Sequence, residues 1–122
     1  MNRCTSAVLI LLLFVLIPKL CVALDASDLE ELLGYTMIAS THVQGDFEGA
    51  DFDKPILLEN GMLFQFSEYN YAYDYRPYVA IFARTFTPEE LRKAGVRNVP
   101  VKPFTVYKLV IDDEIYDAVR VR

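Results

Sequence analysis

Aromatic side chains recur at every second position of one short segment of this sequence. The segment EYNYAYDYRPY (Glu68–Tyr78) contains Tyr69, Tyr71, Tyr73, Tyr75, Arg76 and Tyr78. Alternate residues of a β-strand point to the same face, so the first four of these tyrosines would form one aromatic face. Aromatic rings that carry hydroxyl groups offer flat apolar area and hydrogen bonds to sugars, peptides or proteins. We therefore predict that these six residues bind a protein or carbohydrate ligand.

The same alternation also has a purely structural interpretation. Tyrosine is a favourable strand residue, and aromatic side chains that pair across neighbouring strands stabilise a sheet by packing. On this interpretation the tyrosines form a half-buried ladder in place of a larger aliphatic core. We expect at least two of the four alternating tyrosines, such as Tyr71 and Tyr73, to be packed into the structure.

Carboxylates gather in the segment GDFEGADFD, which carries Asp46, Glu48, Asp51 and Asp53. Oxygen-rich clusters of this kind can hold calcium, but the glycine and the distal glutamate of an EF-hand loop are not in place. The alternation of Phe47 and Phe52 with carboxylates is also typical of a strand edge with its aromatic residues turned inward. We expect a loop or irregular edge that binds neither a metal ion nor a cofactor.

Few residues are suited to catalysis. His42 is the single histidine of the chain, and the serines after residue 23 lie in no nucleophile motif. No glycine-rich phosphate loop is present. Paired carboxylates, as in glycoside hydrolysis, are the remaining route, and they would need a cleft that holds two of them within about 10 Å. We predict that the protein is not an enzyme, and we keep a small secreted carboxylate-dependent hydrolase as the alternative.

The N-terminal residues have the composition of an export signal. Arg3 supplies a positive charge, and the apolar run Ala7–Ile17 follows it. This run is shorter than the roughly 20 apolar residues that a membrane-spanning helix needs, and Ala23 offers a small residue for cleavage. We predict that residues 1–23 are a signal peptide and that residues 24–122 form a single β-rich domain, which is secreted or periplasmic and not stably inserted in a membrane.

Cleavage at this point would change the cysteine content and the net charge. Cys4 and Cys21 would leave with the signal peptide, so the mature chain would have no disulfide and no thiol nucleophile. It would keep all 17 acidic residues and lose Arg3 and Lys19 from the 12 basic ones, which gives a net charge of −7. An acidic surface repels phosphate groups, so nucleic acid and anionic membranes are poor partners.

Capping residues predict two short helices. The first spans Ala26–Tyr35, with Ser27 as the N-cap and Glu30 completing a capping box. The second spans Thr87–Gly95, with Thr87 as the N-cap, a proline in the first turn and a glycine at the end.

Alternating apolar residues and turn signals predict the strands. The pair Asn60–Gly61 between apolar runs has the composition of a type I′ hairpin turn. The strand after it would continue through the tyrosines, with either a bulge near Ser67 or two faces of opposite orientation. We expect a turn at Asp112–Asp113. Ile56–Phe66 would form this hairpin, and its second strand would extend to Tyr75. The other expected strands are Tyr35–Gly45, Tyr78–Phe86, Phe104–Ile111 and Glu114–Val121.

Five or six strands with short connections favour a mainly β fold. We predict a small SH3-like barrel or a strongly bent antiparallel sheet, with one short N-terminal helix and one short inserted helix. The last strand would close the barrel against the first. An OB-like barrel and an open α+β roll are the alternatives.

Three segments of the chain resemble short exported bacterial proteins of unknown function. The segments are GYT at Gly34–Thr36, GDFEGADFDKPILLENGMLF and YNYAYDYRP. In the similar proteins a G-x-F-E-G turn, a D-F-D run and a tyrosine-alternating strand recur. The resemblance implies a secreted or periplasmic β-rich domain and transfers no catalytic residue. A cysteine would be expected near Ala50 or Gln65, and this chain has none there.

The sequence thus favours an exported binding or interaction module whose ligand and oligomeric state it does not reveal. Besides the hydrolase, an inhibitory or structural envelope protein is an alternative. Its interacting element would be the loop Val96–Pro103, which two prolines stiffen.

Cleavage of a signal peptide would determine the first residue of the mature protein. Mass spectrometry of the secreted or periplasmic fraction should find a chain that starts near Leu24 or Ser27, because cleavage follows small residues such as Ala23 and Ala26. Finding only full-length protein embedded in the membrane would contradict the signal-peptide interpretation.

Overall fold

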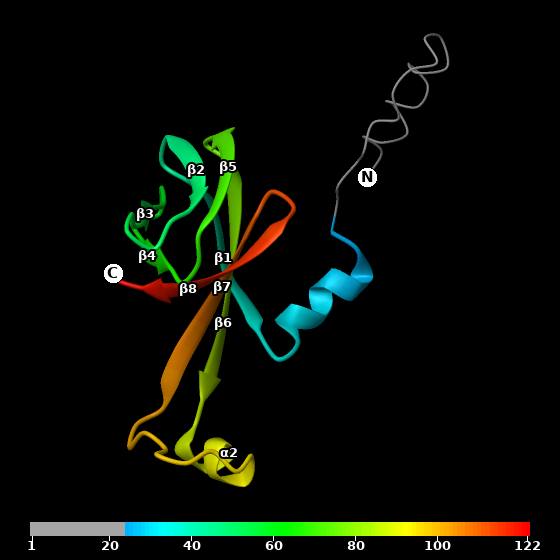
Figure 1. The fold of residues 1–122 in the computed structure, drawn as a ribbon, viewed down its shortest axis with the longest axis vertical. Coiled ribbons are helices and arrows are strands. Elements are labelled where there is room, and N and C mark those ends of the chain that lie inside the picture. Colours follow the sequence, from blue (N-terminus) through cyan, green and yellow to red (C-terminus); the bar gives the residue numbers. More distant parts are fainter. Residues whose placement is uncertain (1–23) are drawn as a thin grey trace.

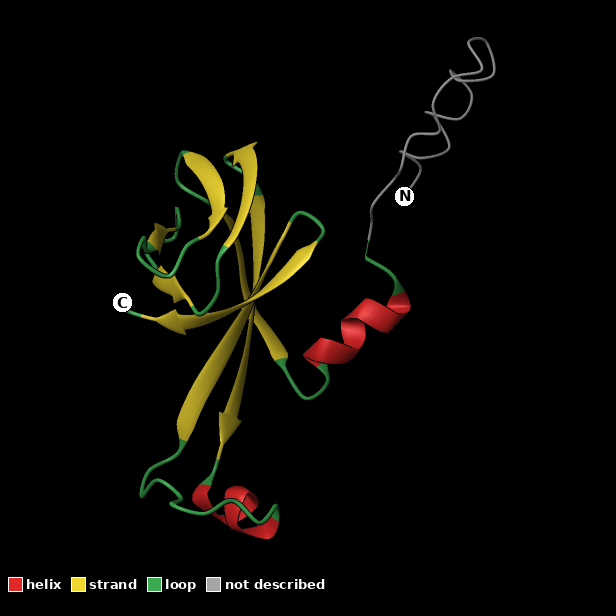
Figure 2. Cartoon of the chain, viewed as in Figure 1, coloured by secondary structure: helices red, strands yellow, loops and turns green. Residues whose placement is uncertain are grey.

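A computed structural model describes residues 24–122 of the protein (Figure 1). The predicted signal peptide, with Cys4 and Cys21, lies outside the described residues. The domain is mainly β, and its centre is a six-stranded antiparallel sheet that curls into a half-barrel. A separate two-stranded sheet and two short helices complete it (Figure 2). This architecture confirms the predicted strongly bent antiparallel sheet with one N-terminal and one inserted helix.

The elements follow one another with short connections. The helices are the 3-10 helix η1 (Ala26–Leu32) and the α-helix α2 (Pro88–Lys93). The strands are β1 (Thr36–His42), β2 (Asp46–Ala50), β3 (Ile56–Leu57), β4 (Leu63–Phe66), β5 (Asn70–Tyr75), β6 (Tyr78–Phe86), β7 (Phe104–Ile111) and β8 (Glu114–Arg120). The large sheet has the order β1-β6-β7-β8-β4-β3, and β2 pairs with β5.

The two edge strands of the large sheet meet at one end of the half-barrel. Val43, directly after β1, forms an isolated antiparallel bridge with Leu58, directly after β3. Beside this bridge, the Gln44 N–H donates to the carbonyl of Leu57 at 3.0 Å. The expectation that the last strand closes against the first is therefore wrong, because β8 pairs with β7 and β4 instead.

The core fills the concave side of the half-barrel with aromatic and aliphatic side chains. Phe66 and Tyr116 pack edge to face with ring centroids 5.3 Å apart, and the centroids of Phe47 and Tyr116 are 6.0 Å apart. Burial raises the pKa of Tyr116 to about 12. The largest fully buried side chains are those of Tyr116, Phe64, Leu58, Ile81, Leu109, Ile111, Val43 and Val79.

The predicted N-cap residue is confirmed for one helix and wrong for the other. In α2, the Thr87 hydroxyl accepts a hydrogen bond from the Glu90 N–H at 3.2 Å, which confirms the predicted cap. Helix η1 instead begins after Asp25, whose N–H donates to the Asp28 carboxylate at 2.8 Å. The predicted cap at Ser27 is wrong, because the N-cap residue is Asp25, two residues earlier.

The turn after β3 is a hairpin connection, as predicted, but not of type I′. Gly61 has a φ of 92°, whereas Asn60 does not have the positive φ that a type I′ turn requires. The Gly61 N–H donates to the carbonyl of Leu58 at 2.9 Å, and the Asn60 side chain accepts from the Met62 N–H at 3.0 Å. These bonds describe a three-residue loop that ends in a left-handed glycine.

Gly61 supplies a stability prediction. Gly61→Val should lower the free energy of unfolding by about 1–3 kcal/mol, because a β-branched residue is strained at positive φ. No other atom lies within 4 Å of the position of a Cβ at Gly61, so backbone strain alone would cause the loss. Gly61→Asn is the matched control, since asparagine tolerates this conformation. Equal denaturant midpoints for the two variants would contradict the assigned turn.

Candidate functional site

The predicted tyrosine strand belongs to a different sheet from the strand before it. The large sheet ends locally at Phe66, and the chain then crosses to pair β5 with β2. Phe64 and Phe66 are buried in the core, whereas the tyrosines lie on the second sheet. The change of side-chain register near Ser67 is therefore a break between two strands and not a bulge within one. We call the two-stranded sheet β2–β5 the tyrosine ribbon.

Gly49 allows the two strands of the tyrosine ribbon to pair. It has a φ of 91°, and a Cβ at this position would lie 2.1 Å from the carbonyl oxygen of Asn70 and 2.5 Å from the amide nitrogen of Ala72. Because real Cβ contacts are not this short, the observed pairing requires glycine. Of the two predicted alternatives, the irregular edge is confirmed for this part of the segment: Asp46–Ala50 forms strand β2, with an irregularity between Phe47 and Gly49 and with Phe47 turned into the core.

The tyrosine ribbon has one buried and one exposed face. On β2, Phe47 and Ala50 point into the core, and Asp46 and Glu48 are exposed. On β5, the alternation leaves Ala72 half-buried and turns the tyrosines outward. The exposed fractions are 66% for Tyr69, 68% for Tyr71, 59% for Tyr73 and 65% for Tyr75. The expectation that at least two of these tyrosines are packed into the structure is therefore wrong.

Carboxylates and tyrosines share the exposed face. The Tyr73 hydroxyl donates to the Asp46 carboxylate at 2.9 Å, across the ribbon from β5 to β2. This hydrogen bond, together with the negative charge of Asp46, raises the pKa of Tyr73 above its ordinary value. The bond holds the Tyr73 ring in one orientation while its face stays open to solvent.

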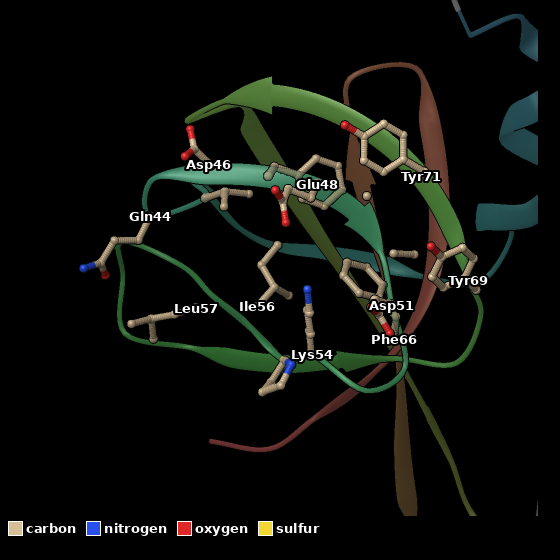
Figure 3. Close-up of a pocket in the computed structure, with 15 residues that line it drawn as sticks. Gln44, Asp46, Glu48, Asp51, Lys54, Ile56, Leu57, Phe66, Tyr69 and Tyr71 are labelled. Atoms are coloured by element: carbon tan, nitrogen blue, oxygen red, sulfur yellow. The ribbon is translucent and has the colours of Figure 1, made fainter.

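A pocket of about 470 Å³ opens beside the tyrosine ribbon (Figure 3). Tyr69 and Tyr71 line one side of it, and apolar residues of the core edge, including Ile56, lie at its base. Glu48 and Lys54 point toward one another in this pocket, without an ion pair among the described residues. The pocket thus combines aromatic, apolar and charged groups, as small-molecule and peptide sites do.

Three more of the predicted residues, Tyr75, Arg76 and Tyr78, line a second, more open pocket of about 590 Å³. Arg76 has a φ of 50°, and its guanidinium Nη2 donates to a Glu59 carboxylate oxygen at 2.9 Å. This pairing lowers the pKa of Glu59. The Tyr78 ring packs on His42 with centroids 4.0 Å apart. The Arg76 side chain is therefore occupied by its ion pair with Glu59. The neighbouring Tyr78 is 70% exposed.

Six carboxylates in and beside the tyrosine ribbon have no basic partner within residues 24–122. Asp51 accepts a hydrogen bond from the Asp53 N–H at 2.8 Å, but no basic side chain lies within ion-pair distance of either residue. In the same part of the chain, no three histidine, cysteine or acidic side chains are placed to hold a metal ion. The carboxylates that lack a basic partner are those of Asp46, Glu48, Asp51, Asp53, Glu68 and Asp74.

Comparison with protein-family models, with curated proteins and with solved structures finds no match. No helix within residues 24–122 is long and apolar enough to cross a membrane.

The exposure of the tyrosines predicts how their truncation affects stability. Tyr71→Ala and Tyr73→Ala should each change the free energy of unfolding by less than about 1 kcal/mol, because surface substitutions remove little packing. Tyr116→Ala, which truncates a tyrosine that is 1% exposed, should cost about 3–5 kcal/mol. Chemical denaturation measures all three. A loss at Tyr71 or Tyr73 as large as that at Tyr116 would show that the ribbon tyrosines are structural.

Proposed function

We propose that this protein is an exported binding module, and that the tyrosine ribbon with its adjoining pocket engages a protein or carbohydrate partner. The observation that carries this proposal is the exposure of the four alternating tyrosines Tyr69, Tyr71, Tyr73 and Tyr75, each of which is at least 59% exposed. The export part of the proposal depends on the predicted signal peptide. The resemblance to short exported bacterial proteins agrees with it.

Exposed tyrosines in this number support recognition more readily than stability. A packed ladder would gain free energy from burial, whereas these rings leave most of their area in contact with water. Contiguous exposed apolar area on a small domain is typical of an interaction surface. Tyrosine is also enriched at protein interfaces and supplies both stacking area and a hydroxyl group.

A small carboxylate-dependent hydrolase is the second candidate, because three carboxylates line one pocket. Asp46, Glu48 and Asp51 all border the pocket beside Tyr69 and Tyr71. Asp46 and Glu48 are two positions apart on β2, a separation of about 7 Å along a strand. Asp46 already accepts the Tyr73 hydroxyl bond, which leaves Glu48 and Asp51 as the groups for acid and base roles.

A glycan array and a peptide array test the binding proposal directly. The full-length chain should bind at least one probe class, and the double variant Tyr71→Ala/Tyr73→Ala should lose at least about tenfold in affinity, because central aromatics dominate many interfaces. Val119→Ala, which truncates another exposed apolar side chain on β8, is the control and should bind like the parent.

Two results would contradict the proposed function. If the double variant binds its probe as tightly as the parent, the tyrosine ribbon is not the binding surface. If glycans are cleaved, and Glu48→Gln abolishes the cleavage while the tyrosine variant retains it, the hydrolase is correct instead.

A further inference from the structure

Opposite ends of the molecule carry opposite charge. The ribbon end, residues 46–76, has seven acidic and two basic residues, a net charge of −5. Residues 84–104 have five basic and two acidic residues, a net charge of +3. This basic segment comprises the outer ends of β6 and β7 with α2 and the loop between them, and we call it the arm. Figure 1 shows α2 at the lower end of the molecule and the tyrosine ribbon at the upper end.

The arm is a stiff extension of the central sheet. The β6–β7 ladder runs without interruption from Val79 opposite Ile111 to Phe86 opposite Phe104. The last pair of rings stacks with centroids 5.6 Å apart, and the Arg84 guanidinium lies 4.5 Å from the Phe86 ring centroid. The ladder thus extends the tip of the arm away from the core (Figure 1).

Basic and apolar side chains are exposed together at the tip of the arm. Arg92 is paired with Glu89 at 3.7 Å, but Lys93, Arg97 and Lys102 have no ion-pair partner within residues 24–122. In the same segment, Val96 is 45% exposed and Val101 is 93% exposed. The tip thus offers charged groups without partners and apolar groups without cover.

The tyrosine ribbon offers the complement of this surface. Its carboxylates have no basic partner within the described domain, and its tyrosine faces can accept both apolar contacts and cations. We propose that the arm of one copy of this protein docks on the tyrosine ribbon of a second copy. This inference rests on the proposed function, since it names the partner of the same binding surface.

Charge complementarity is the reason to expect a second copy on this surface. Two copies with a net charge of −7 each repel one another in most orientations, but arm-to-ribbon contact brings +3 against −5. An antiparallel pair of molecules makes this contact twice and closes, whereas head-to-tail addition makes it once for each added copy. Both arrangements bury the same two surfaces.

Analytical ultracentrifugation of the protein, expressed from its full sequence and purified from the fraction in which it accumulates, tests the contact. At low ionic strength the protein should associate reversibly with rising concentration. Raising the salt from about 0.01 M to about 1 M should return it to monomers, because the Debye length falls from about 30 Å to about 3 Å.

Charge reversal identifies the two surfaces. The arm variant Arg97→Glu/Lys102→Glu should weaken self-association by at least about tenfold. The ribbon variant Glu48→Lys/Glu68→Lys, which changes one carboxylate on β2 and one in the connection just before β5, should do the same. None of these side chains forms an ion pair within residues 24–122, so folding should be unaffected. An equimolar mixture of the two variants, and one chain carrying all four substitutions, should both associate again.

A control and three outcomes complete the test. Arg120→Glu/Arg122→Glu changes the net charge as much as the arm variant does, and it should associate like the parent. A parent that stays monomeric at low salt overturns the inference, and the arrays then show separately whether the proposed function survives. Charge-reversed variants that associate like the parent also overturn it. A monomeric parent that sediments with phosphatidylglycerol vesicles, unlike the arm variant, would assign the arm to anionic surfaces instead.

Discussion

The surface of this protein depends on the close approach of two backbones at Gly49. A side chain there would overlap the Asn70 carbonyl oxygen, so the pairing of β2 with β5 is possible only with glycine. That pairing decides the orientation of the segment, because Phe47 and Ala50 take the buried positions and leave the tyrosines of β5 facing outward. The chemistry offered to a partner therefore follows from one steric constraint.

The protein divides its aromatic residues between two tasks. Phe64, Phe66 and Tyr116 pack inside the half-barrel, where dense contacts must supply the stability that a domain without disulfides needs. The tyrosines of β5 add almost nothing to this core and lie instead beside carboxylates that no basic group neutralises. This combination of exposed aromatic and acidic surface on a small domain is what supports the proposed contact with another molecule.

Local signals in the sequence were sufficient for part of the fold. Thr87 caps α2 and Asp112 begins the turn before β8, because in both cases a residue and its immediate neighbours determine the backbone. For β2 the sequence left a loop and an irregular edge open, because its acidic composition resembles a loop and its partner lies twenty or more residues away. The alternation of tyrosines predicted a common face correctly, but the burial of that face depends on long-range pairing. Gly49, which lies between the inward-facing Phe47 and Ala50, was the one local sign of this pairing.

Hydroxyl-radical footprinting read out by mass spectrometry tests most directly whether the tyrosine ribbon is a surface that a partner covers. In dilute protein at low ionic strength, we expect Tyr71, Tyr73 and Tyr75 to be oxidised rapidly and Tyr116 slowly. In concentrated protein at the same ionic strength, the three ribbon tyrosines should become protected while Tyr116 does not change. Ribbon tyrosines that are already protected in dilute protein, or that react equally at both concentrations, would contradict this account.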